Sequence, residues 1–231
     1  MRRRKFTSGV VSAGGLWALA ACSSAGAVGI TGNDAVLGMR VALERGATAA
    51  VSLLGKNGGF LDNPKVRIPL PGFLNEASKV LKYTGQQRRI EELVTAMNRA
   101  AEAAVPQAKA LLVNAVKAMS VEDGKQILTG GDNAVTDFFA GKTREPLSVT
   151  FLPIVTRATE KVALAEKYNT VAGKAAGLGL LRQDDASIQQ YVTGKALDGL
   201  YLMIGEEERK IRRDPVGTGS AILQKVFGSL R

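Results

Sequence analysis

The chain has 231 residues, 45% hydrophobic and 23% charged, a balance that is typical of one globular domain and not of a disordered chain. It contains no histidine and one cysteine, which excludes Ser-His-Asp and Cys-His catalysis, imidazole bases and zinc sites built on imidazole or several thiolates. The formal net charge is +10, but the basic residues are scattered, so we expect no nucleic-acid partner. We also expect no cofactor and no bound metal.

The first 21 residues have the pattern of a secretory signal peptide. A basic start, Arg2–Lys5, precedes an apolar run over Val10–Ala21, and this order is typical of export signals. The run is shorter than the stretch of about 20 apolar residues that a membrane-spanning helix needs. Arg3 and Arg4 also resemble the twin-arginine export signal, so that route and the general secretory route both remain open.

The four residues Leu19-Ala20-Ala21-Cys22 resemble the lipobox of bacterial lipoproteins. This resemblance implies cleavage between Ala21 and Cys22 and acylation of the Cys22 sulfur, which would anchor the protein to a membrane without a transmembrane helix. Ser23 stands where an aspartate would resemble an inner-membrane retention signal, so we expect an outer-membrane lipoprotein that faces the periplasm. Small residues then predict a lipidated, flexible tether over 22–33 and a single domain over 34–231.

The domain is predicted to be all-α, a compact multi-helix fold with one extended, proline-rich arm. Its first helix spans about 35–54, with Asp34 as the N-cap. Residues 56–71 form the arm, because two prolines one residue apart near its end prevent a helix and favour an extended backbone. A short helix over about 73–83 follows.

The third helix carries the clearest apolar period in the chain, and Pro106 bends it or starts a new helix after it. Ser120 and Asp123 resemble a capping box with Asp in place of Glu, which opens a short helix to Leu128. The buried face of the third helix is expected at Ile90, Leu93, Val94, Met97, Ala101 and Ala104, and its polar face at Arg88, Glu91, Thr95, Asn98, Arg99 and Glu102.

Two aromatic residues, Phe138 and Phe139, lie on the next predicted helix. A separate, longer helix is expected to start at Pro146 and to be kinked at Pro153, because proline lacks the amide hydrogen that a helix interior uses. Another helix is expected around position 168, where it includes Tyr168, and it ends in a glycine-rich turn. These helices are expected to pack closely through small residues.

The most apolar helix is expected to form the centre of the core, with Asp185 as its N-cap. It continues into a charged C-terminal segment from Glu206 to Arg213, the charged exit, which is expected to be solvated. Two pairs in this exit, Glu206 with Lys210 and Glu208 with Arg212, have the favourable i, i+4 spacing. A short helix over about 218–228 ends the chain.

A specific combination of short strings covers the domain from Ala49 to Gly228. The strings are Ala49–Gly55, Asn63–Pro71, Met97–Glu102, Ile127–Asp132, Phe151–Val155, Lys195–Leu200 and Val226–Gly228. In this combination the chain resembles the bacterial domain-of-unknown-function 4197 family. The resemblance implies a helical envelope protein, and it brings no established activity, substrate or catalytic residue.

Polar residues at three places are candidates for function. Asn98, Arg99 and Glu102 lie on adjacent turns of one helix face, where a polar ligand can bind, although a solvated face or a tie to a neighbouring helix is favoured. Asp132 follows two glycines at a helix start, where a cap is favoured over an anion site. Asp198 interrupts the apolar helix, and a buried pair with a lysine or arginine is favoured over a functional acid.

The arm is the segment most suited to an interaction, since long loops often carry function. Lys65 and Arg67 are placed to contact an acidic partner. The apolar residues between and after them equally suit simple packing over a gap between helices. The sequence leaves both interpretations open.

Together these features predict a non-catalytic, periplasm-facing lipoprotein with an interaction or envelope-maintenance role, which binds another envelope protein or the cell wall. One alternative is a carrier of lipid or another apolar ligand, since small-residue helices around an apolar core can enclose a cavity. A second is an envelope glycan hydrolase that uses two acids about 5 to 10 Å apart beside a cleft. The candidate acids are Glu102, Asp132, Asp198 and Glu206.

Overall fold

The computed structural model describes residues 32–72, 74, 75, 78, 85–131 and 134–214. The predicted signal peptide, Cys22, Asp132 and the helix over 218–228 lie outside these residues, as do most of the tether and most of the helix over 73–83. Within the described part every regular element is helical, as predicted. None of its helices is long and apolar enough to cross a membrane.

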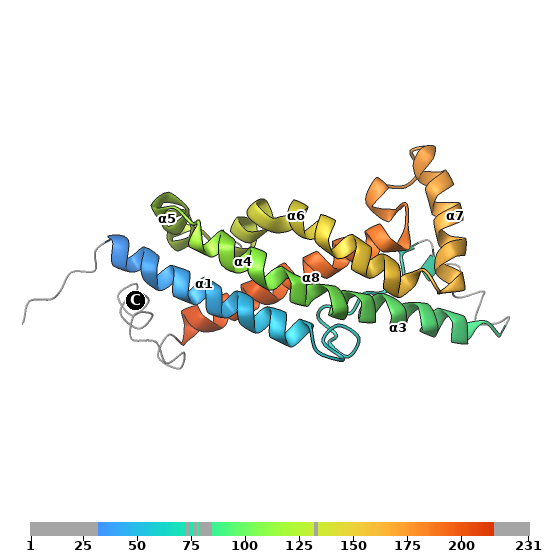
Figure 1. Ribbon diagram of the computed structural model, residues 1–231, viewed down its shortest axis with the longest axis horizontal. Helices are drawn as coiled ribbons and strands as arrows, with labels where there is room; N and C mark the ends of the chain where they lie inside the picture. Colours follow the sequence, from blue (N-terminus) through green and yellow to red (C-terminus); the bar gives the residue numbers. More distant parts are fainter. Residues whose placement is uncertain (1–31, 73, 76–77, 79–84, 132–133, 215–231) are drawn as a thin grey trace, which may run out of the picture.

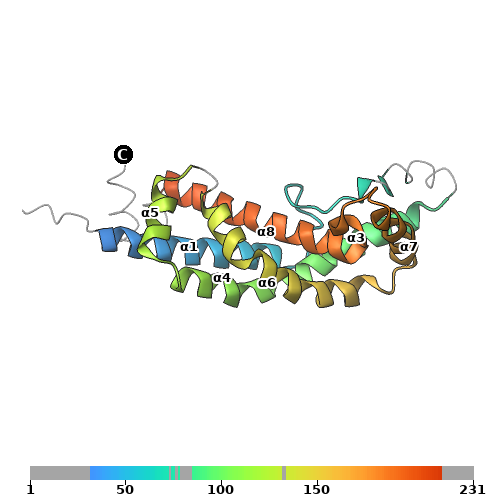
Figure 2. The ribbon, with the colours of Figure 1, turned by 90° about the horizontal axis from the view of Figure 1, so that it is seen from above.

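The helices form an elongated bundle (Figures 1 and 2). Helices α1 and α3 follow each other along the long axis, and α8 runs beside both. Helix α5 lies at the end where α1 begins, and α7 lies at the opposite end, next to α3. The bounds are α1 (Gly32–Leu54), α3 (Gln87–Ala104), α4 (Ala108–Lys117), α5 (Val121–Thr129), α6 (Ala134–Thr159), α7 (Ala163–Gly177) and α8 (Ile188–Arg213).

Helix α8 forms the centre of the core, as predicted. It packs most extensively against α6 and α1 and also contacts α3. Its buried residues recur on more than one face, which is the pattern of a helix enclosed by neighbours. They include Ile188, Val192, Ala196, Leu200 and Ile204, each at most 1% exposed.

The N-cap of α8 is Ser187, so the prediction of Asp185 was wrong. The Ser187 hydroxyl accepts a hydrogen bond from the Gln190 backbone N–H at 3.2 Å, which satisfies one of the free amides at the helix start. Asp185 ends the short 3-10 turn η2 (Gln183–Asp185) that precedes the cap. The first helix also differs at its start: α1 begins at Gly32, so Asp34 lies inside the helix.

Helix α6 is one continuous helix, where the sequence predicted a break at Pro146. Both Pro146 and Pro153 lie within it, and both are exposed. On the opposite side, a stripe of buried residues recurs every fourth position and packs the helix against α3 and α8. This burial offsets the cost of the prolines, which is about 3 kcal/mol each in a helix interior. The stripe is Phe139, Thr143, Leu147, Phe151, Val155 and Thr159.

The expected changes of direction around α4 and α5 are confirmed. Pro106 lies in a 3-10 turn, η1 (Val105–Gln107), between α3 and α4. The Ser120 hydroxyl accepts a hydrogen bond from the Asp123 N–H at 3.0 Å, and the Asp123 carboxylate accepts one from the Ser120 N–H at 2.9 Å. This reciprocal capping box opens α5 as predicted.

The segment between α1 and Gly72, hereafter the 55–71 loop, is not extended along its whole length. Successive turns fold its first part, with hydrogen bonds from Asp62 N to Gly58 O at 3.2 Å and from Arg67 N to Asn63 O at 2.8 Å. Only the stretch from Ile68 to Leu70 lacks such turns. Phe60 and Ile68 are almost fully buried, so the loop is packed against the bundle and is not a free arm.

Candidate functional site

Glu102 fastens the first half of the 55–71 loop to α3. One carboxylate oxygen accepts hydrogen bonds from the backbone N–H groups of Phe60 and Leu61, both at 3.0 Å. The other accepts from the Arg99 guanidinium at 2.6 Å. Burial alone would raise the pKa of Glu102, but hydrogen bonds from Leu61, Arg99, Phe60 and Gly58 outweigh it and hold the pKa below its ordinary value.

Asn98 fastens the second half of the same loop. Its side-chain oxygen accepts from the Ile68 N–H at 2.8 Å, and its amide nitrogen donates to the Ile68 carbonyl at 3.0 Å and to Val94 O at 2.8 Å. The side chain thus pairs with Ile68 as a neighbouring strand would. Asn98 is fully buried and Glu102 is 5% exposed. Of the two favoured interpretations, the solvated face was therefore wrong for these two residues, whereas the tie within the chain is confirmed, with the loop in place of a neighbouring helix.

The loop meets α8 at Gly199. A β-carbon on this residue would lie 2.9 Å from Phe60 Cε1 and 3.2 Å from Val66 Cβ, closer than side chains normally pack. The glycine therefore allows the loop to lie directly on the helix. The loop is held between α3 on one side and α8 on the other.

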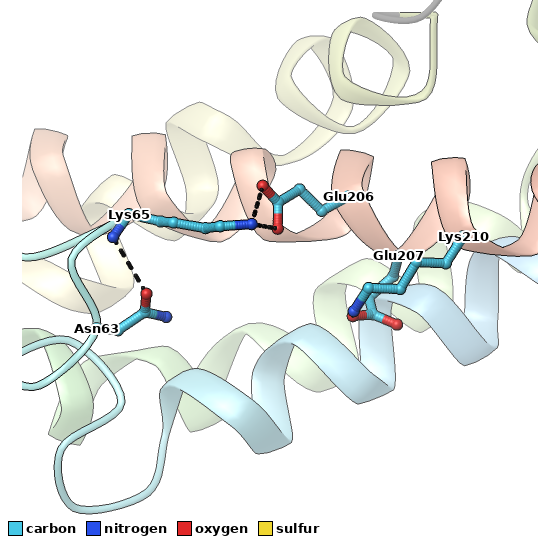
Figure 3. Close-up of polar contacts among 5 residues, drawn as sticks. All are labelled: Asn63, Lys65, Glu206, Glu207 and Lys210. Carbon is cyan, nitrogen blue, oxygen red and sulfur yellow. Dashed lines mark hydrogen bonds and ion pairs between the residues drawn. The ribbon is translucent and has the colours of Figure 1, made fainter.

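Lys65 and Arg67, the two loop residues that were predicted to contact a partner, both bind within the chain. Lys65 Nζ lies 2.8 Å from each carboxylate oxygen of Glu206 on α8 (Figure 3). Arg67 donates to the Leu61 carbonyl at 2.7 Å. The predicted pair of Glu206 with Lys210 is absent, because Lys210 binds Glu207 instead. Both cations remain largely exposed, so their contacts orient the side chains and still leave them at the surface.

The charged exit of α8 is less solvated than predicted. Glu208 is 6% exposed, and it lines a small apolar hollow with Met39, Leu43 and Ile204. This hollow has a volume of about 10 Å³, close to the minimum that one water molecule needs. It offers no room for a lipid, so it gives the carrier interpretation no support.

A larger open hollow, the α6–α8 groove, lies between α6, α8, the segment before α8 and the end of the loop. Its volume is about 900 Å³, which is in the range of small-ligand sites. Apolar and polar groups line it in similar amounts. Three basic and four acidic side chains take part, namely Arg144, Arg182, Lys195, Glu145, Asp184, Asp185 and Asp198.

Asp198 lies in this groove and is not buried, so its predicted burial was wrong. Half of its side chain is exposed. The Arg144 guanidinium donates to one carboxylate oxygen at 2.7 Å, and Lys195 Nζ lies 3.8 Å from the other. The predicted pairing with a basic residue is confirmed. Asp198 occupies the one face of this part of α8 that turns to the groove, three residues after Lys195.

Aromatic rings support both basic residues of this cluster. The Arg144 guanidinium carbon lies 6.0 Å from the centre of the Tyr201 ring, and Lys195 Nζ lies 5.9 Å from that of Tyr191. Both distances fall within the range of cation–π attraction. The Tyr191 hydroxyl donates to Pro69 O at 3.1 Å, which joins the loop to the groove wall. Burial raises the pKa of Tyr191 to about 12, so this phenol stays neutral and remains a donor.

Thr193 is the feature of the groove that points most directly to a ligand. It lines the groove, and it is only 2% exposed. Its Oγ1 is buried and hydrogen-bonds to none of the residues that the structure describes. A buried hydroxyl without a partner carries a desolvation cost, and a polar ligand group that reached it would remove that cost.

The three described acids among the candidates for glycan hydrolysis do not share the groove. Glu102 binds the loop backbone and Glu206 binds Lys65, while Asp198 alone of the described candidates lines the groove. No group of three or more metal-ligating side chains occurs in the described residues.

Most of the groove could not be predicted from the sequence. Its α8 wall did leave a signal, because Tyr191, Lys195 and Asp198 recur at helical spacing on one face. Its α6 wall left none, because nothing in the sequence pairs Arg144 with a residue 54 positions away.

A family described as "Protein of unknown function (DUF4197)" matches residues 29–228 of the chain. The match covers every helix of the described bundle. No curated protein and no solved structure matches the chain.

Proposed function

The chain belongs to the DUF4197 family, and since that membership assigns no activity, we propose a function from the residues themselves. The protein is a non-catalytic lipoprotein that is anchored through Cys22 in the outer membrane, faces the periplasm, and binds an envelope partner in the α6–α8 groove. The anchor rests on the lipobox-like string Leu19–Cys22 and on the basic and apolar segments before it. The partner is another protein of the envelope or the cell wall.

The observation that carries the binding role is the groove of about 900 Å³ with charged walls, to which Thr193 contributes a residue whose buried hydroxyl has no partner among the described residues. Around it, Arg144 and Lys195 share the single carboxylate of Asp198, so a second anionic group can join them without displacing a full partner. Asp184 and Asp185 supply carboxylates elsewhere in the same groove. A partner segment that carries hydrogen-bonding groups and both signs of charge matches this lining.

The same residues support a role without catalysis. Asp198 is paired with Arg144 at 2.7 Å, and Asp184 with Arg182 at 3.0 Å, so both carboxylates already have partners within the chain. The chain also has no histidine to serve as a base.

Site-specific photo-crosslinking in living cells tests the groove. A photoreactive residue at Ser148, which lines the groove, is compared with one at Val149, which is 72% exposed outside it. We expect a discrete adduct from position 148 and none from position 149. Equal adducts at both positions, or none at either, would contradict the proposal.

Thr193→Val separates binding from folding. Loss of a buried, unpartnered hydroxyl stabilises the fold by about 1 kcal/mol, whereas the adduct at position 148 is expected to weaken. A variant that is more stable and still forms the full amount of adduct would show that Thr193 does not take part in binding.

The anchor has its own test. Metabolic labelling with a fatty-acid probe should mark the protein, and Cys22→Ser should abolish the mark and leave an uncleaved chain. An unlabelled native protein would overturn the anchor and leave the groove untouched.

A further inference from the structure

Three acceptor groups meet at the end of the α6–α8 groove where η2 leads into α8. Asp185, the last residue of η2, lines the groove together with Tyr168 of α7 and Tyr191 of α8. Each phenol donates its proton to a backbone carbonyl, Tyr168 to Asp185 O at 2.8 Å and Tyr191 to Pro69 O at 3.1 Å. Because a hydroxyl oxygen can accept as well as donate, both phenol oxygens keep the capacity to accept a hydrogen bond.

The charge of this end of the groove comes from Asp185. Burial, and after it the negative charge of Asp185, raises the pKa of both Tyr168 and Tyr191. Tyr168 acts on Tyr191 in the same direction, so the three groups lie within electrostatic reach of one another. The two phenols stay neutral and the carboxylate is charged. We call Asp185, Tyr168 and Tyr191 the acceptor cluster.

The other charges of the groove leave Asp185 without an ionic partner. Each basic residue of the groove lies beside a different acid: Arg182 at 3.0 Å from Asp184, Arg144 at 2.7 Å from Asp198, and Lys195 at 3.8 Å from Asp198. Asp185 and Glu145 form no ion pair with any residue that the structure describes. With three basic and four acidic side chains the groove has a net charge of −1, which a cationic group on a ligand would neutralise.

We infer that the acceptor cluster binds a primary ammonium group of the ligand that occupies the groove. An ammonium group has three N–H donors, and the carboxylate and the two phenol oxygens supply three acceptors. The bond to the carboxylate is charge-assisted and is the strongest of the three. A quaternary ammonium group fits less well, because it needs an open aromatic face. The rings of Tyr168 and Tyr191 are buried, and Lys195 Nζ already lies 5.9 Å from the centre of the Tyr191 ring.

This inference rests on the proposed function. The groove suits a ligand with hydrogen-bonding groups and both signs of charge, and the acceptor cluster identifies the positive group and the place where it binds. The hydroxyl groups of Ser148 and Thr193 line the groove beyond the cluster. The ligand class is therefore a compound with a free primary amino group on a body that carries hydrogen-bonding groups.

The test uses the purified chain from residue 22 onward with Cys22→Ser, so that no acyl chain is present. All described contacts lie within residues 32–214 and are retained. The probe is alanyl-alanine amide, which carries one ammonium group and no carboxylate, and its binding is followed by chemical-shift titration in NMR spectra of the protein. We expect saturable binding that shifts the signals of Tyr168 and Tyr191.

Two modified probes separate a hydrogen-bonded ammonium group from general attraction of a cation. The N-acetyl form has no charge, and the N,N,N-trimethyl form keeps the charge but has no N–H donor on the amine. We expect both to bind about tenfold or more weakly than the free amine. Equal binding of the trimethyl form and the free amine would overturn the inference.

Asp185→Asn keeps the shape of the side chain and removes its charge. It is expected to weaken binding of the free amine by about tenfold or more and to remove most of its advantage over the N-acetyl form. Asp137→Asn, which removes an equal charge from an exposed position of α6 outside the groove, is the matched control and should bind normally. Thermal unfolding establishes that both variants are folded. Equal weakening by the two variants, or no binding of the free amine to the unmodified groove, would overturn the inference.

The outcome is distinguishable from that of the proposed function. If no probe binds but the adduct at position 148 forms in cells, the groove keeps its envelope partner and the amine site is wrong. If the probe binds as expected but no adduct forms, the amine site stands and the envelope partner is wrong.

Discussion

The side-chain amide of Asn98 forms two hydrogen bonds with the backbone of Ile68, one in each direction. A single residue of α3 thereby satisfies both polar backbone groups of a buried loop residue 30 positions away. The loop has no helix or strand to do this in its place, and buried backbone groups need such partners.

Asn98→Ala should destabilise the protein by about 2–4 kcal/mol, because it leaves the N–H and carbonyl of Ile68 buried without partners. Urea unfolding measures the loss. Thr95→Ala, on an exposed position of the same helix, is the control and should change stability by less than about 0.5 kcal/mol. If the two variants unfold alike, the loop does not depend on this amide.

Glu102→Gln should make stability less dependent on pH. The folded pKa of Glu102 is lowered from its ordinary 4.5, so the carboxylate stabilises the fold above that value, and the contribution is lost as pH falls through the lowered folded pKa. At pH 7 we expect the variant to be about 1–3 kcal/mol less stable. The difference in stability between the two proteins should narrow as the pH of the urea titration falls below 4.5.

The matched control for this change is Glu92→Gln, an exposed position of α3. It should show neither the loss at pH 7 nor the narrowing at low pH. A Glu102→Gln deficit that stayed constant with pH would mean that shape, and not charge, fastens the loop.

Gly199→Ala should cost about 1–3 kcal/mol, because the new methyl group would meet Phe60 and Val66 at less than normal contact distance. Gly194→Ala, five residues earlier on α8, meets no atom within 4 Å and should be neutral or stabilising by up to about 1 kcal/mol. Thermal unfolding of the two variants compares them directly. Equal melting temperatures would show that the loop can move away from α8.

Asp198→Asn should change stability by no more than about 1 kcal/mol, since its ion pair with Arg144 is half exposed. Loss of a partner from a buried pair would instead cost about 3–5 kcal/mol. Denaturant unfolding distinguishes the two. Because Asp198 lines the α6–α8 groove, we expect the substitution to change the yield of the adduct at position 148, although the free energy of unfolding stays within about 1 kcal/mol of the native value.

Sequence periodicity predicted most of the helices, because apolar residues at helical spacing record which face of each helix is buried. It failed where a contact came from far along the chain. The polar face of α3 looks solvated from its own sequence, and only the 55–71 loop makes Asn98 and Glu102 buried. Asp198 differs in the opposite direction: its apolar sequence neighbours predict burial, but they belong to the other faces of α8 and Asp198 is half exposed.

Local rules also failed where packing overrode them. Pro146 is a helix breaker by its own chemistry, yet the buried stripe of α6 passes it without interruption. The capping box at Ser120 was predictable because all its atoms lie within four residues. The pairing of Arg144 with Asp198 was not predictable, since nothing in the sequence indicates which exposed basic residue pairs with which carboxylate.

Lys65 and Arg67 display side chains that trypsin recognises, but the peptide bonds that follow them lead into the buried residues Val66 and Ile68. A protease must draw an extended stretch of backbone into its own cleft, and the bonds from Asn98 and Glu102 hold that stretch in place. Cleavage there has to wait for the segment to detach from α3 and α8. The rate of cleavage would therefore measure how often this part of the protein opens, and not how exposed the two side chains are.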